Sequence, residues 1–169
     1  MRNTLMLFLS CFMLINPIFV KATEKTNSLN DTYAIPEELI QYFEEAGKEK
    51  NICPELLEAI AFYESRFIPD LENENCVGIM QIDVKIHKSR MERFGYSKKD
   101  MLDPEKNIII AADILYDIYQ MYGDDNPFVI MYYSGQKKAL TEYKKSGKIS
   151  NHARDVLILS EKYERYHDK

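Results

Sequence analysis

The stretch LEAIAFYES at residues 57–65 decides how this chain is organised. If it is helical, Leu57, Ile60, Ala61 and Glu64 lie on one stripe, because residues three and four positions apart share a helix face. Three of these residues are apolar, so the carboxylic acid of Glu64 occupies a core position. A carboxyl group among apolar neighbours loses hydration, and its pKa rises from about 4.3 toward neutrality, as a general acid requires.

Two other acids on the same helix sharpen this interpretation. Glu55 and Glu58 are predicted to project to the opposite side, so a solvated acidic face does not account for Glu64. The alternative is structural: Glu64 pairs with a basic residue, or it marks a half-exposed last turn.

Length and composition fit one compact domain. The chain has 169 residues, 46% of them hydrophobic, and a formal net charge of −5. No long basic run is present, which argues against nucleic acid as the main partner but leaves a local basic patch open.

The N-terminus has the pattern of a secretory signal. Arg2 precedes a nearly continuous apolar run over residues 5–20, and small residues stand before a predicted cleavage site after Ala22. An uncleaved anchor is the alternative, whereas the surroundings of Cys11 do not fit a lipoprotein. Residues 1–22 are therefore assigned to a signal peptide, residues 23–35 to a polar disordered spacer and residues 36–169 to the folded domain.

The folded part reads as mainly α, with at most a small β segment. Helix start and stop signals such as Asp103-Pro104 and Gly123 bound most of the elements. No segment shows sustained period-two alternation, which argues against a large sheet. The expected helices span residues 36–49, 54–65, 104–122, 126–133, 137–145 and 151–163.

The apolar segment VGIMQI at residues 77–82 carries two unusual residues. Gly78 permits another part of the backbone to approach closely. The amide of Gln81 must be satisfied by the protein or by a polar ligand such as a sugar, because buried polar groups form hydrogen bonds.

Four motifs in order resemble the catalytic domain of the soluble lytic transglycosylases. They are Glu64-Ser65, the GIMQI segment at 78–82, the DPEKNI segment at 103–108 and the YYSG segment at 132–135. The resemblance extends from about residue 52 to residue 163. It implies a lysozyme-like, mostly helical single domain that cleaves peptidoglycan.

Carried over by motif position, the resemblance assigns roles to five residues. Glu64 matches the catalytic acid/base, and Ser65 matches the hydroxyl beside it. Met80 and Gln81 match residues that line the glycan groove, and Tyr132 matches a groove tyrosine.

The resemblance implies that substrate is bound by Ser65, Met80, Gln81, Tyr132, Tyr133 and His152, of which the last two depart from the family pattern. Tyr133 stands where the family usually has a sugar-contacting Asn. His152 stands at a tyrosine near the catalytic acid, where it can still donate a hydrogen bond. A charged His152 would instead lower the pKa of the acid.

The chemistry implied by the resemblance needs one carboxyl group. The acid protonates the oxygen that leaves C1 of N-acetylmuramic acid, and its carboxylate then takes the proton of the C6 hydroxyl, which closes a 1,6-anhydro ring. A hydrolytic muramidase is the nearest alternative, and it usually needs a second carboxylate roughly 5–10 Å away. The loop acids that could supply one are Asp70, Glu72, Glu74 and Asp83.

The two cysteines outside the predicted signal are expected to form a disulfide. Cys53 begins the helix that carries Glu64, and Cys76 precedes Gly78, so the two segments meet if both line one groove. An oxidising compartment would favour the bond, with two buried free thiols as the alternative.

No cofactor or metal site is expected, because His87, His152 and His167 lack ligand spacing. The sequence thus predicts a secreted, cell-wall-associated lytic transglycosylase that acts on peptidoglycan glycan strands and meets the membrane only through its signal peptide. A secretion-apparatus partner is left open. The alternative from another class is a catalytically impaired member that only binds glycan or a partner.

Overall fold

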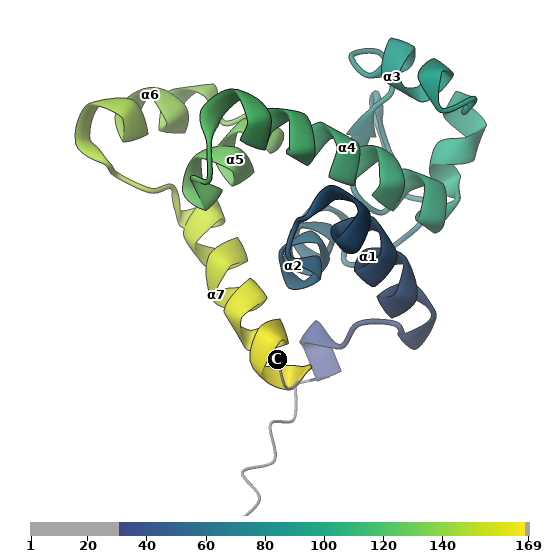
Figure 1. Ribbon diagram of the computed structural model, residues 1–169, viewed down its shortest axis with the longest axis horizontal. Coiled ribbons are helices and arrows are strands. Elements are labelled where there is room, and N and C mark those ends of the chain that lie inside the picture. The colour runs from purple at the N-terminus through teal and green to yellow at the C-terminus, as the bar shows by residue number, and fades with distance from the viewer. Residues whose placement is uncertain (1–30, 168–169) are drawn as a thin grey trace, which may run out of the picture.

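A computed structural model describes residues 31–167, which form seven α-helices, two short 3₁₀ helices and one small sheet that lies to one side of the molecule (Figure 1). This confirms the mainly α, lysozyme-like fold. No helix of the described part is long and apolar enough to cross a membrane. The elements are η1 (Asp31–Tyr33), α1 (Glu37–Lys50), α2 (Pro54–Ser65), β1 (Glu72–Asn73), β2 (Cys76–Val77), β3 (Ile82–Asp83), α3 (Lys88–Arg93), η2 (Lys98–Leu102), α4 (Pro104–Tyr122), α5 (Asn126–Tyr133), α6 (Lys137–Ser146) and α7 (Asn151–Tyr166).

Local capping residues set the helix ends, as predicted. The Asp103 side chain accepts hydrogen bonds from the first turn of α4, and the helix closes at Gly123. Ser150 caps α7 by accepting a hydrogen bond from the amide of Ala153. These groups satisfy backbone donors that the first turn of a helix leaves unpaired.

Helix α2 is the centre of the domain and packs against α1 and α7 (Figure 1). Nine of its twelve residues are buried. Glu55 and Glu58 are only 2% and 1% exposed, so the prediction that they lie on a solvated side is wrong. The Glu58 carboxylate lies 3.3 Å from Nε2 of His167, just beyond the end of α7. The prediction assumed that only one face of the helix packs against the rest of the protein. Helix α2 is instead enclosed on several sides, so both faces are buried.

The sheet is small and antiparallel, as the absence of alternation indicated. Its order is β1-β2-β3, with Asn73 opposite Cys76 and Val77 opposite Ile82. The turn between β2 and β3 contains the GIMQ segment, so the sheet presents that segment to the end of α2.

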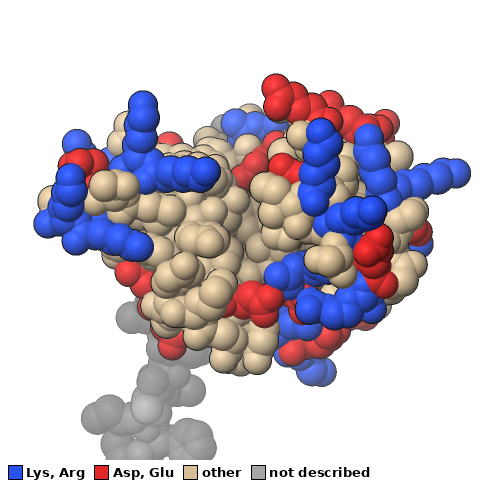
Figure 2. Space-filling model, turned by 90° about the horizontal axis from the view of Figure 1, so that it is seen from above, with Lys and Arg blue, Asp and Glu red and all other residues tan. Residues whose placement is uncertain are grey.

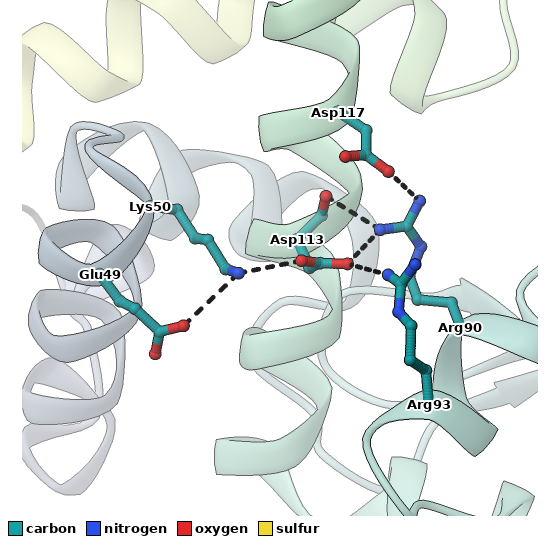
Figure 3. Close-up of polar contacts among 6 residues, drawn as sticks. All are labelled: Glu49, Lys50, Arg90, Arg93, Asp113 and Asp117. Carbon is teal, nitrogen blue, oxygen red and sulfur yellow. Dashed lines mark hydrogen bonds and ion pairs between the residues drawn. The ribbon is translucent and has the colours of Figure 1, made fainter.

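A buried charge network ties α1, α3 and α4 together (Figure 3). Asp113 on α4 contacts Lys50 Nζ through Oδ1 at 2.9 Å, and its Oδ2 pairs with Arg90 and, at 2.9 Å, with Arg93. Arg90 also reaches Asp117 at 2.7 Å. Burial by itself would raise the pKa of Asp113, but the hydrogen bonds and charges of Lys50 and Arg90 outweigh it and lower that pKa. Asp113 thus has a structural role, because it links α4 to α1 and α3.

The N-terminal assignments fall mostly outside the described residues. The predicted signal peptide at 1–22 and the spacer up to residue 30 lie there. The last part of the predicted disordered spacer is ordered instead, because Asp31–Tyr33 forms η1. The Tyr33 ring packs 5.0 Å from that of Phe62, and its carbonyl accepts a hydrogen bond from Tyr163 at 2.9 Å.

Candidate active site

Glu64 lies in the last turn of α2 and is half-buried. Burial raises the pKa of its carboxyl group above the ordinary value, and a hydrogen bond from Ser134 partly offsets the rise. This is the environment predicted from the helical stripe. It favours a neutral carboxylic acid, which can donate a proton.

A chain of polar groups connects Glu64 to α7. Ser134 Oγ, at the end of α5, donates to Glu64 Oε1 at 3.2 Å and lies 3.0 Å from His152 Nε2. With the hydroxyl proton directed at the carboxylate, the serine oxygen accepts from an Nε2–H of His152. His152 therefore reaches the acid through Ser134, a residue that the sequence analysis did not select.

His152 is held as a neutral ring. Burial lowers the pKa of its imidazole, against an opposing contribution from the charge of Asp155. Its ring packs edge-on to Tyr63, with 5.7 Å between the centroids. A neutral imidazole donates one hydrogen bond without adding a positive charge beside Glu64.

Tyr133 holds the loop that carries Met80. Its hydroxyl donates to the carbonyl of Met80 at 2.8 Å. Burial, followed by the neighbouring acidic groups Glu64 and Cys76, raises its pKa well above the ordinary value, so the phenol stays protonated. The phenol at this position braces the loop that carries Met80.

Two predicted substrate-binding residues are inaccessible. Ser65 is 4% exposed, and its hydroxyl donates to the carbonyl of Ile79 at 2.6 Å. The Met80 side chain is fully buried. The prediction that these two side chains contact a glycan directly is therefore wrong. Both residues instead hold the GIMQ turn against α2.

Asn107 holds the same turn from α4 and is fully buried. Its Oδ1 accepts from the Met80 amide at 2.8 Å, and its Nδ2 donates to the carbonyls of Val77 and Met101 at 2.9 Å each. A Cβ on Gly78, where φ is +80°, would lie 2.3 Å from Asn107 Nδ2. The sequence analysis noted the DPEKNI motif but did not select Asn107, although a buried amide in an apolar helix face is a detectable signal.

Gln81 satisfies its amide within the protein. Nε2 donates to the carbonyls of Leu71 at 3.0 Å and Gly78 at 2.9 Å, and the residue has a left-handed φ of +49°. The sequence left open whether the protein or a polar ligand satisfies the Gln81 amide, and for Nε2 the protein does so. The half-buried side chain closes the turn between the strands.

Tyr132 lies on the surface, 41% exposed. Its ring is 5.3 Å from that of Tyr122 and 6.0 Å from that of Phe128. These three rings form an aromatic cluster at the junction of α4 and α5. An exposed ring of this kind can stack on a sugar.

The predicted Cys53–Cys76 disulfide is wrong, because both cysteines are free. Cys53 precedes α2 and donates to Glu55 at 3.0 Å, whereas Cys76 lies in β2, near the opposite end of α2 and the charge of Glu64. The intervening helix of twelve residues is about 18 Å long at 1.5 Å per residue. The sequence places both thiols beside the same helix but does not show that they flank different ends.

Of the acids considered for a second carboxylate, Asp83 lies deepest. It pairs across the sheet with Cys76, and its Oδ1 accepts hydrogen bonds from the amides of Lys85 and Ile86. Glu72 pairs with Lys98 at the surface at 2.8 Å. No group of acids, histidines and cysteines within residues 31–167 could hold a metal ion.

Comparison with known proteins agrees with this geometry. The profile of the Transglycosylase SLT domain family matches residues 41–155. The invasion protein IagB of Salmonella typhimurium is 35% identical over 107 residues, which cover 60% of this chain and 66% of IagB. Protein IpgF of Shigella flexneri is 32% identical over 130 residues, 73% of this chain and 78% of IpgF. The match to IagB thus spans just under two thirds of that relative.

Proposed function

The chain belongs to the Transglycosylase SLT domain family, and from this premise we propose that it is a peptidoglycan lytic transglycosylase with Glu64 as its single acid/base. Protonated Glu64 gives its proton to the oxygen that leaves C1 of N-acetylmuramic acid. The resulting carboxylate takes the proton of the C6 hydroxyl, whose oxygen then bonds to C1. The glycosidic bond is exchanged for a 1,6-anhydro bond, so no water is consumed.

The observation that carries the proposal is the environment of Glu64. Burial raises its pKa, which supports the protonated form that the first step uses. The carboxyl group projects from a helix that is buried almost throughout, so its position is well defined. A fixed acid with a raised pKa is the main requirement of this chemistry.

Ser134 and His152 support the second half of the cycle. Once Glu64 has lost its proton, the Ser134 hydroxyl donates to the carboxylate and His152 donates in turn to Ser134. These hydrogen bonds stabilise the ionised form, which must persist until it removes the C6 proton. The hydrogen bond from Ser134 opposes the effect of burial on the pKa of Glu64.

Peptidoglycan as substrate supports an extracytoplasmic location, and the predicted signal at residues 1–22 agrees with export. A mature chain that begins at Thr23 is part of this proposal. Two alternatives remain open. In the first alternative, a hydrolytic muramidase, Asp83 in β3 after the GIMQ turn would supply the second carboxylate that such enzymes commonly use. An impaired glycan binder has less support, since the Tyr133 and His152 departures are accommodated by hydrogen bonds.

The deciding experiment is mass spectrometry of purified peptidoglycan after incubation with the protein. Release of anhydro-muropeptides supports the proposal, reducing ends indicate a hydrolase, and no release indicates a binder. Glu64→Gln should lower the rate by about two to four orders of magnitude, because it removes the transferable proton. Glu105→Gln, at an exposed position of α4, is the matched control. Glu55 and Glu58 are unsuitable controls because they are buried.

A further inference from the structure

Helix α6 is strongly basic although the chain as a whole is acidic. Residues 137–148 contain five lysines and one glutamate, a net charge of +4, against −5 for the full chain. All five lysines are exposed, and within residues 31–167 none of them forms an ion pair. The local basic patch that the composition left open is therefore concentrated on this helix.

The lysines of α6 share one side of the helix. At 3.6 residues per turn, Lys137, Lys138, Lys144 and Lys145 fall within an arc of roughly 120°. We call these four residues the α6 lysine face. The opposite side packs on the core through partly buried apolar residues, and the helix is also anchored by the Tyr143 hydroxyl, which donates to Asp125 at 2.9 Å. Figure 2 shows blue side chains gathered at the left end of the molecule, where Figure 1 has α6.

The α6 lysine face follows the candidate active site closely in the chain and contacts the aromatic cluster of α4 and α5. Ser134, which contacts Glu64, lies three residues before Lys137 in the chain. Lys144 Nζ lies 5.2 Å from the ring centre of Phe128 and 6.0 Å from that of Tyr122, over the aromatic cluster that includes Tyr132. A ligand that stacks on exposed Tyr132 would therefore meet a positive charge beside it.

From this arrangement we infer that the α6 lysine face binds the carboxylates on the peptide stems of the glycan strand whose bond lies at Glu64. The inference rests on the proposed function, which places a peptidoglycan strand at Glu64. The strand extends beyond the bond that is cleaved, and its stems carry free carboxylates. Aromatic rings for the sugar, together with lysines for the stems, match both parts of such a polymer. The face thus selects charged, stem-bearing glycan over a neutral one.

The test is a pelleting assay in the Glu64→Gln background, so that binding is measured without turnover. Substituting Gln at the four positions of the α6 lysine face removes four charges while keeping helix propensity. The control variant replaces Lys48, Lys88, Lys99 and Lys162 by Gln, which removes the same charge from α1, α3, η2 and α7. Each protein is mixed with intact sacculi, with sacculi whose carboxylates have been amidated, and with anionic phospholipid vesicles, over a salt series.

We expect the face variant to bind intact sacculi about five- to fiftyfold more weakly at low salt, with the difference shrinking as salt rises, since exposed ion pairs contribute modestly and are screened. The control variant should bind like the Glu64→Gln parent, and amidated sacculi should bind parent and face variant equally. Equal losses in the face and control variants would overturn the inference, as would a loss confined to vesicles. If the wild type releases no anhydro-muropeptides but face-dependent sacculus binding persists, the proposed reaction fails and the inferred binding face stands.

Discussion

Replacing Ser134 by alanine probes the hydrogen-bond chain that sets the protonation of Glu64. The substitution removes the donor to Glu64 Oε1 and breaks the link to His152. It leaves the burial of Glu64 in place, and burial is the larger influence on its pKa. With the opposing contribution gone, the pKa of Glu64 should rise further.

The size of the rise follows from the geometry. A hydrogen bond to an ionised group contributes roughly 1.5–3 kcal/mol. The 3.2 Å distance is longer than the usual O–H···O distance of about 2.5–3.0 Å, so the lower end applies. At about 1.36 kcal/mol per pKa unit, a loss of about 1.5 kcal/mol raises the pKa of Glu64 by about one unit.

The assay is the pH dependence of kcat/KM for release of anhydro-muropeptides. In the proposed mechanism activity falls at high pH when Glu64 ionises, so the alkaline limb of the Ser134→Ala profile should lie about one unit higher than in the wild type. Ser134→Thr keeps the hydroxyl and should leave the limb in place. An alanine profile whose limb stays within about 0.3 units of the wild type, or moves to lower pH, would refute the role of Ser134.

Two further predictions concern the framework of the site. Asp113→Asn should lower the free energy of unfolding at pH 7 by about 1–2 kcal/mol in urea denaturation, because Lys50 and Arg90, whose side chains are 17% and 16% exposed, each lose one of two carboxylate partners. Because the pKa of Asp113 is lowered in the folded state, ionised Asp113 stabilises the fold at pH values above its ordinary pKa of 3.8, and this stabilisation is lost as the pH falls below that value. The stabilities of wild type and Asp113→Asn should therefore converge in acid. A difference that stays constant down to pH 3 would contradict the assignment. Gly78→Ala should cost about 3 kcal/mol or more, because its Cβ would collide with the backbone carbonyl of Met101 and with Asn107 at a left-handed φ. Gly95→Ala shares the left-handed φ but meets open space, and an equal loss of thermal stability in both variants would show that the close approach at Gly78 is unimportant.

Much of the helical framework was predictable because its signals are local. The Asp103-Pro104 start and the Gly123 end of α4 depend on residues within one turn, so the chain reports them directly. The placement of Glu64 on an apolar stripe is equally local, and burial raises its pKa as expected. Family motifs added the GIMQ turn, but they did not distinguish residues that contact a ligand from residues such as Met80 that hold the turn.

The predictions that failed all depend on which elements meet. Glu58 was assigned to a solvated side and lies instead beneath α7, and Cys53 and Cys76 flank opposite ends of α2. Ser134 and His152 are distant from Glu64 in sequence, and only the packing of α5 and α7 around α2 brings their side chains to the acid. Sequence by itself determined the helices, their caps and the placement of Glu64 among apolar residues, because hydrogen bonds and side-chain spacing within one helix follow from neighbouring residues. Tertiary structure alone showed that Ser134 contacts Glu64 and links it to His152, and so decided how strongly Glu64 holds its proton, because solvation and charge depend on elements that meet only in the folded chain.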